Sequence, residues 1–348
     1  MRAALALVIA GCLAAQVQEA PQPAPVPGVA PGPAPTPKDE VAGAKLKAVI
    51  DAGHAWLKKH QDADGRWSAS AFVVHDPKGA PCTGAGRPDQ DVFVTALVVV
   101  SCHGLGQIGT QAPEYQQRAI AWLRAQRQEN GTIGQPGERM LARNTATSSD
   151  ALSSAGSYDN TGRELPATTE WLLDNRTADG LWRAPDSDAP DWVTTTMALC
   201  YLAEVGHEKA GDGVLGRLFQ LGEKELPHGP VAGAAFLAAW YVRDADMRAR
   251  CCDLLARTPP ATALPREQRD YFAWYCTTQA MQFHDKETWD KWWRALVATA
   301  TTLQRQDGSF AGSWDPDDVR GREGGRVYAT AAMLLALEVA WRKEYRDK

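Results

Sequence analysis

One segment recurs four times along the chain and limits what the chain can fold into. Each copy combines an amphipathic helix pattern that carries Trp with a following Gln or Asn and a turn that contains Gly. The helical Trp residues of the four copies are Trp56, Trp122, Trp171 and Trp293. Gly can supply the positive φ that ends a helix, and an aromatic residue two positions later, such as Trp67, can fold back onto the last helical turn. Recurrence of one unit predicts a repeat architecture, and it accounts for the presence of 13 Trp against only 7 Phe.

Helices of a second kind are expected between these copies. They are small and apolar, with Thr or Ser near their starts, and span residues 91–105, 144–155, 191–205, 271–284 and 327–341, with weaker patterns at 213–225, 229–243 and 244–256. A helix of an inner ring contacts neighbours on most of its faces, whereas a helix of an outer ring contacts them on one face only. Helices that are apolar on every face and alternate with helices that carry a single apolar stripe therefore fit two concentric rings. We therefore expect an all-α protein of about twelve helices closed into an α/α toroid, with an open helical solenoid as the alternative.

The repeated Gln, Asp-Gly and Trp resemble the QW motif. The most specific stretch runs from Gln304 to Glu338 and contains Gly308-Ser309-Phe310, Gly312-Ser313-Trp314-Asp315 and Gly324-Gly325-Arg326-Val327-Tyr328-Ala329-Thr330. Residues 39–348 are similar to the prenyltransferase and squalene-cyclase repeat family, which implies an α/α toroid of six helix pairs. The resemblance is closer to exported bacterial repeat proteins of unassigned activity than to true cyclases.

The first twenty residues have the pattern of a secretory signal peptide: Arg2, an apolar run and then small residues. Ile9 to Cys12 resemble a lipobox, which makes Cys12 a lipidation candidate, and ordinary cleavage near Ala14 or Ala15 is the alternative. Residues 21–38 are rich in Pro and Ala and predict an extended linker before the folded part at 39–348. We expect an exported protein that is periplasmic or envelope-associated, either free or lipid-anchored.

The charge balance argues against two classes of partner. Lys and Arg number 37 against 42 Asp and Glu, a formal net charge of −5. This leaves no basic surplus to hold a phosphate backbone or an anionic membrane surface. No nucleic acid is expected, and a membrane only through a lipid at the N-terminus.

The resemblance implies where a cyclase acid would lie. Class II terpenoid cyclases protonate an alkene with the middle Asp of an Asp-x-Asp-Asp-Thr-Ala motif at the start of an inner helix. The string from Asp91 to Ala96 fits this pattern except that Phe93 and Val94 replace the two acids, and the string at Asp191 lacks them as well. The string Asp315-Pro316-Asp317-Asp318 has the letters but is predicted in a loop. Asp315, Asp317 and Asp318 are thus weak catalytic candidates, since a carboxyl needs burial to stay protonated.

No metal or cofactor site is predicted. Cys276 and His284 lie two helical turns apart, and no His-Glu-x-x-His pair is present. The Gly-x-Gly-x-x-Gly strings at 104–109 and 211–216 lack the strand that a dinucleotide fingerprint requires. Small buried residues of the inner ring are the interpretation of Cys102, Cys200 and Cys276, whereas Cys82, Cys251 and Cys252 could form bridges in an oxidising compartment.

The ring geometry predicts a central cavity whose mouth lies at the starts of the inner helices. Residues expected there include Asp91, Asp191, Tyr271, Trp274 and Tyr328, either as helix caps and packing aromatics or as the lining of a pocket for an apolar or polysaccharide-like ligand. We therefore expect an exported toroid protein that lacks cyclase chemistry. Its function would be to bind an apolar molecule, such as an isoprenoid, or a protein partner. The alternatives are a squalene-hopene-like class II cyclase that uses Asp315 to Asp318 and a polysaccharide-active toroid enzyme.

Overall fold

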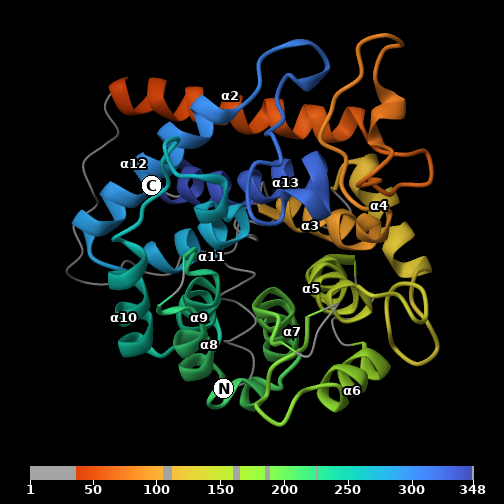
Figure 1. Ribbon diagram of the computed structural model, residues 1–348, viewed down its shortest axis with the longest axis vertical. Helices are drawn as coiled ribbons and strands as arrows, with labels where there is room; N and C mark the ends of the chain where they lie inside the picture. The colour runs from red at the N-terminus through yellow and green to blue at the C-terminus, as the bar shows by residue number, and fades with distance from the viewer. Residues whose placement is uncertain (1–36, 105–111, 160–164, 185–188, 225, 347–348) are drawn as a thin grey trace, which may run out of the picture.

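The computed structural model describes residues 37–104, 112–159, 165–184, 189–224 and 226–346. The predicted signal peptide, Cys12 and nearly all of the linker lie outside these residues. Within them twelve α-helices alternate between two rings (Figure 1). The outer helices are α2 (Pro37–Lys59), α4 (Glu114–Ala125), α6 (Pro166–Asp174), α8 (Val214–Gly222), α10 (Ala245–Leu255) and α12 (Lys286–Leu303). The inner helices are α3 (Asp91–Gly104), α5 (Leu141–Asp159), α7 (Trp192–Glu204), α9 (Gly229–Trp240), α11 (Tyr271–Met281) and α13 (Gly321–Trp341).

The inner helices form a closed ring. Each packs against the next one along the chain, and α13 packs back against α3. The outer helices lie against them, and α12 contacts α2 where the two ends of the ring meet. The α/α toroid is therefore confirmed, and the open solenoid is excluded because α13 and α3 are neighbours.

The valine-rich run of residues 98–100 lies within α3 and is helical. Gly104 ends that helix, and residues 105–109 lie outside the described residues. Only isolated bridges and no strands occur in the part of the chain that is described, so a dinucleotide-binding βαβ unit is excluded there.

The repeated Gln residues join neighbouring outer helices. The Gln61 side-chain amide follows α2 and donates to the carbonyl oxygens of Gly65, in its own turn, and Tyr115 in α4, both at 2.7 Å. The Gln304 amide follows α12 and donates to Gly312 at 3.0 Å and to Val49 in α2 at 2.8 Å. The same joint is thus used inside the ring and at its closure.

A second repeated joint fastens each turn to the inner ring. The backbone N–H groups of Trp67, Trp182 and Trp314 each donate to a Thr hydroxyl of the following inner helix, at 2.9, 3.1 and 3.3 Å. All three Trp rings are fully buried. The repeat therefore serves packing, which explains the Trp bias of the composition.

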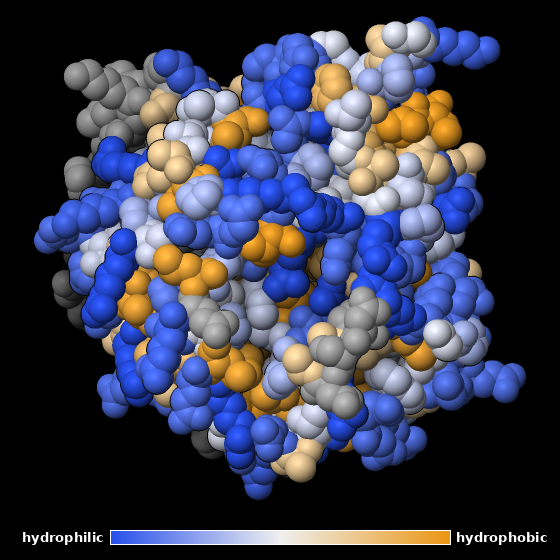
Figure 2. All heavy atoms as spheres, in the orientation of Figure 1, coloured by the Kyte–Doolittle hydropathy of each residue, from blue (hydrophilic) through white to orange (hydrophobic). Residues whose placement is uncertain are grey.

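Figure 2 shows a surface of mostly hydrophilic residues, with hydrophobic ones scattered among them. The large exposed hydrophobic side chains among the described residues are Val74, Leu221, Leu226, Val242, Phe283 and Val319. None of the described helices has the length and apolar character needed to span a bilayer.

Candidate functional site

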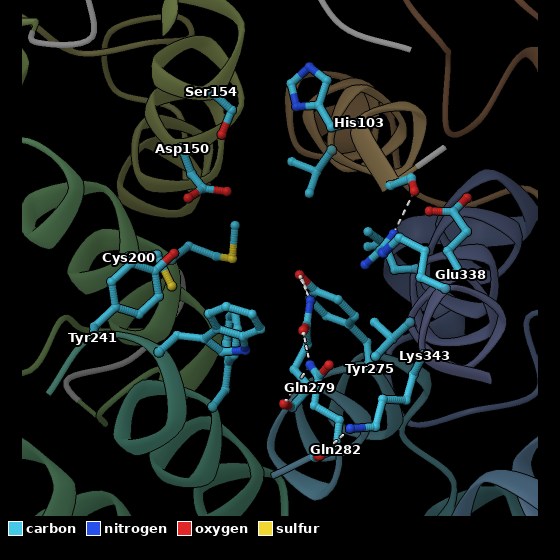
Figure 3. Close-up of a pocket in the computed structure, with 18 of the residues that line it drawn as sticks. His103, Asp150, Ser154, Cys200, Tyr241, Tyr275, Gln279, Gln282, Glu338 and Lys343 are labelled. Carbon is cyan, nitrogen blue, oxygen red and sulfur yellow. Dashed lines mark hydrogen bonds between the residues drawn. The ribbon is translucent and has the colours of Figure 1, made fainter. Parts of the chain in front are cut away.

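A cavity of about 760 Å³ occupies the centre of the inner ring, and we call it the lumen. Its lining comes from the C-terminal halves of the inner helices and from the start of α12 (Figure 3). A volume of this size is typical of a pocket for one small molecule. The ring therefore encloses a site and is not filled throughout by packing side chains.

Apolar and aromatic side chains make up much of the lining. Val100, Met197, Phe236, Tyr275 and Leu335 come from five different inner helices. The Phe236 and Tyr275 rings meet edge-on with their centroids 5.6 Å apart. Such a surface recognises an apolar body through burial and aromatic contact.

Polar groups gather where α11 and α13 end. The Gln279 amide donates to the Tyr275 hydroxyl at 3.3 Å, and the Gln282 amide donates to the Gln279 side-chain oxygen at 3.0 Å. Lys343 donates to the Gln282 carbonyl at 3.1 Å, and Arg342 donates to the Gly104 carbonyl at 2.6 Å. This side of the lumen offers hydrogen bonds to the polar end of a ligand.

Asp150 on α5 is the notable acid of the lumen. Its side chain is 8% exposed and points toward the centre of the site in Figure 3. Burial raises the pKa of Asp150 well above its usual value, and the nearby charge of Glu204, which also lines the lumen, acts in the same direction. Its surroundings therefore favour the protonated carboxyl, which can donate a hydrogen bond.

Two buried histidines, His103 in the lining of the lumen and His54 behind Glu338, have pKa values shifted in opposite directions. Burial lowers the pKa of His103 to about 4, and neither ring nitrogen has a hydrogen-bond partner among the described residues. His54 pairs with Glu338, with Nε2 2.7 Å from Oε1. Burial disfavours the charge of His54, but hydrogen bonds with Cys102 and Glu338 outweigh it and raise the pKa of His54 to about 10. His103 thus lines the lumen as a neutral ring with unused hydrogen-bonding capacity.

The acids expected at the cavity mouth lie at the starts of the inner helices but do not line the lumen. Asp91 begins α3 and accepts from the Ala69 backbone N–H at 2.8 Å. Asp191 caps α7 and pairs with Arg143 at 3.0 Å. Burial alone would raise the pKa of Asp191, but Arg143 and Arg320 hold it below its usual value.

The aromatic candidates are packing residues at the same end of the ring. Tyr271 and Tyr328 are 1% and 0% exposed. The Tyr328 ring stacks on Phe93 with centroids 6.2 Å apart. Trp274 borders a small cavity of about 30 Å³ beside Trp292, apart from the lumen.

The cluster from Asp315 to Asp318 also lies outside the lumen. Arg305 and Arg326 bind Asp315, and Arg269 binds Asp317. Asp318 is fully buried and accepts from the Tyr271 N–H and the Tyr328 hydroxyl, both at 3.1 Å. Burial raises the pKa of Asp318 to about 7, with the charge of Asp270 adding to the effect. Each of these three carboxyls therefore has a partner on a neighbouring element, and none of the three lines the lumen.

The two acids Asp150 and Glu338 were not predicted as site residues, although the sequence contains a pattern that indicates them. Asp150 and Glu338 are charged residues inside segments that were predicted to be apolar on every face. Such a residue has no solvent side, so it must face the lumen or a buried partner. The six described cysteines are free and buried, as expected for Cys102, Cys200 and Cys276; the bridges considered for Cys82, Cys251 and Cys252 are not formed.

No protein-family model matches the sequence, and no curated protein matches it. Solved structures match at low identity. A variant of the type II terpene cyclase MstE from Scytonema, in complex with geranylgeranyl dihydroxybenzoate, is 14% identical with a TM-score of 0.38, over 88% of this chain and 99% of that one. Ligand-free MstE is 15% identical with a TM-score of 0.38, over 87% and 98%. A protein from Actinoplanes is 14% identical with a TM-score of 0.33, over 86% and 99%.

Proposed function

We propose that the lumen binds one molecule with an elongated apolar body and a single polar end, and that isoprenoid alcohols are the first class to test. The observation that carries the proposal is a buried carboxyl, Asp150, that faces a largely apolar cavity of about 760 Å³ and whose pKa is raised by that burial. Aromatic and aliphatic side chains bind the body, and Asp150 donates a hydrogen bond to the polar end. The enclosed volume favours a small molecule over a protein partner.

The acid strength of Asp150 distinguishes a role in ligand binding from a role as a catalytic proton donor. A carboxyl whose pKa is raised holds its proton at neutral pH, but it is a correspondingly weaker acid. Protonation of an isolated alkene demands a strong acid, whereas donation to a hydroxyl or carbonyl oxygen does not. Hydrogen bonding by Asp150 is therefore the role that its environment supports best.

Titration of the full chain with geranylgeraniol, followed by tryptophan fluorescence or calorimetry, tests this function. We expect saturable binding of one molecule per chain, weakened when Met197→Trp narrows the lumen. Asp150→Leu should weaken binding by roughly fivefold, because one buried hydrogen bond is worth about 1 kcal/mol, while Asp150→Asn should retain most of it. Asp317→Asn, outside the lumen, is the control. Equal binding by the wild-type chain and Met197→Trp would exclude the lumen as the site.

A second candidate function is acid-initiated cyclisation, favoured by the aromatic faces around the same acid. Phe236, Trp240 and Tyr275 line the lumen with Asp150, and such rings stabilise cationic intermediates. In this candidate Asp150 replaces the Asp315 to Asp318 cluster as proton donor. Incubation with squalene should then give a product of unchanged mass and altered retention, absent with Asp150→Asn. Recovery of unaltered squalene after long incubation would leave binding as the function.

We further propose that the protein is exported, on the signal-like pattern of residues 1–20. Cys12 is the proposed site of a lipid anchor. Labelling of expressing bacteria with a palmitate analogue, followed by fractionation, tests both points. Label in wild type but not in Cys12→Ser supports the anchor, and recovery of the chain in the cytosolic fraction contradicts export.

A further inference from the structure

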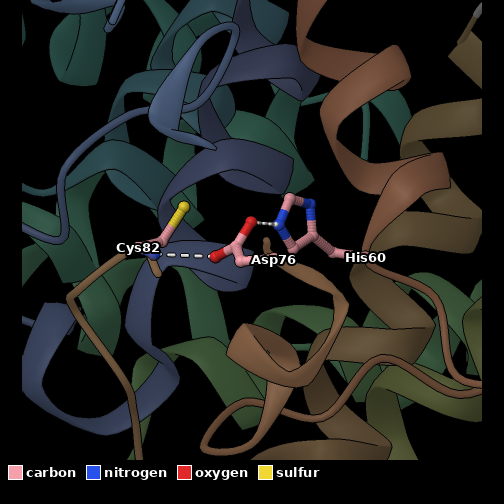
Figure 4. A group of neighbouring side chains, drawn as sticks. All are labelled: His60, Asp76 and Cys82. Atoms are coloured by element: carbon pink, nitrogen blue, oxygen red, sulfur yellow. Dashed lines mark hydrogen bonds and ion pairs between the residues drawn. The ribbon is translucent and has the colours of Figure 1, made fainter. Parts of the chain in front are cut away.

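Three side chains that no part of the proposed function uses come together outside the lumen (Figure 4). His60 directly follows α2, Asp76 follows the short 3-10 helix η1 (Phe72–His75), and Cys82 lies further along the same loop. One ligand atom from each lies within 4.8 Å of the other two. The His60 and Asp76 side chains are 0% exposed, and Cys82 is 4% exposed.

The His60 ring is held between two oxygen acceptors. Nδ1 lies 2.8 Å from the Trp56 carbonyl oxygen, which can only accept, so Nδ1 carries a proton. Nε2 lies 2.9 Å from Asp76 Oδ1, so in the neutral ring a lone pair faces a carboxylate oxygen. A positive charge between the two atoms, either a second proton or a metal ion, would make this contact favourable. A ring that donates from one nitrogen to a backbone carbonyl and presents the other is the usual arrangement of a metal-bound histidine.

Cys82 distinguishes this cluster from a simple ion pair. Its backbone N–H donates to Asp76 Oδ2 at 2.7 Å, which leaves Oδ1 facing His60. Its Sγ lies 2.9 Å from the carbonyl oxygen of Ser309. One nitrogen, one carboxylate oxygen and one sulfur are all donors that Zn²⁺ takes in proteins, and they supply three of the four ligands of a tetrahedral site.

The charges around the cluster are compatible with a dication. A thiolate and a carboxylate together balance the charge of Zn²⁺, and the Cys82 thiol would release its proton on binding. Lys59 lies 3.2 Å from Asp76 Oδ1, but its side chain is 45% exposed and can turn into solvent.

We propose that His60, Asp76 and Cys82 form a zinc site that fastens the long loop between α2 and α3. The site joins the end of α2, the loop at Asp76 and the last repeat turn at Ser309, which belongs to η6 (Gly308–Phe310). The zinc site would thus link these three segments close to the contact between α2 and α12 that closes the ring. Its role is structural, because the three residues lie outside the lumen.

Metal titration of the full chain, freed of metal by a chelator, tests the proposal. We expect one Zn²⁺ per chain in competition with a chromophoric chelator, and a raised melting temperature. Co²⁺ in place of Zn²⁺ should show a thiolate-to-cobalt charge-transfer band. Cys82→Ser and His60→Gln should each weaken binding at least tenfold and abolish the melting shift, and Cys82→Ser should also remove the band. Cys251→Ser, a buried thiol on α10, should leave all three readouts unchanged.

Cys82→Ser replaces a single atom, so its circular dichroism without metal should match that of the metal-free wild type. Should it fail to fold, Asp76→Asn provides the same comparison. Absence of stoichiometric zinc binding to the wild-type chain would overturn the proposal. Binding that persists unchanged in Cys82→Ser and His60→Gln would place the metal elsewhere and overturn it equally.

Discussion

Among single residues, the charged side chains inside the inner helices have the largest effect on the lumen and on stability. A helix buried on all faces has no solvent side, so each charge needs the lumen or a partner. Asp150 faces the lumen, where burial raises its pKa, whereas Glu338 bonds to His54 of the outer helix α2. Burial raises the pKa of Glu338, although His54 and Arg342 act in the opposite direction. The pair therefore retains a proton well above the usual titration range of a histidine.

This pair makes stability depend on alkaline pH. The pKa of His54 is raised from 6.5 to about 10 in the folded chain, so its contribution is complete below pH 6.5 and is lost as pH rises toward 10. Urea unfolding should show stability falling over this interval by about 2–5 kcal/mol. Glu338→Gln should flatten this slope and lower stability at pH 7. His207→Gln, a partly exposed histidine after α7, should keep it; a wild-type profile flat to pH 10 would contradict the assignment.

At the scale of elements, the glycines of the repeated turns set how closely an outer helix approaches the next turn. A Cβ on Gly65 would lie 2.5 Å from the Arg118 carbonyl oxygen in α4, and one on Gly312 would lie 2.3 Å from that of Ala52 in α2. One on Gly131 would lie 2.2 Å from that of Ala167 in α6. Each turn therefore docks backbone against backbone, which only a residue without a side chain permits.

Gly131→Ala should destabilise the protein more than Gly137→Ala. Both residues have positive φ, +86° and +80°, so both substitutions add a similar backbone strain of about 1 kcal/mol. Only Gly131 meets another element, since nothing lies within 4 Å of a Cβ on Gly137. We expect an additional loss of about 1–3 kcal/mol for Gly131→Ala in urea unfolding. Equal losses would show that φ alone, and not docking, selects this glycine.

Most of the elements could be predicted because their signals are local. The Gly turns and the switch from one apolar stripe to all-round apolarity located α3 at 91–105 and α7 at 191–205, within about two residues of the observed ends. The observed α13 is longer than 327–341 because a kink at Gly325 joins a short preceding turn to the main helix.

The position of the site could not be predicted in the same way. Asp91 and Asp191 are visible in the sequence as acids at helix starts, but the arginines near them are brought there by the fold. Arg143 reaches both Asp191 and Glu323 from α5, and Arg320 reaches Asp270. These pairings depend on how the inner helices pack, which places residues far apart in sequence side by side. The zinc cluster was missed for the same reason, since Asp76 and Cys82 lie in a loop without a metal-binding spacing.

The whole molecule is a ring in which the two ends are not equivalent. Buried ion pairs and stacked aromatics occupy the starts of the inner helices, while the lumen lies toward their ends. Closure makes the first and last outer helices neighbours, so no repeat is terminal. In an open solenoid a terminal joint contributes little, because it has a partner on one side only.

Closure can be tested by comparing equivalent Gln residues around the ring. Gln61→Ala removes the joint from α2 to α4, and Gln304→Ala removes the joint from α12 to α2. In a closed ring we expect both to lower the free energy of unfolding by about 1–3 kcal/mol, since each removes two hydrogen bonds of the side-chain amide. Gln128→Ala, whose bonds stay within its own turn, should cost less. A nearly neutral Gln304→Ala beside a costly Gln61→Ala would mean that the ring is open in solution between its first and last helices.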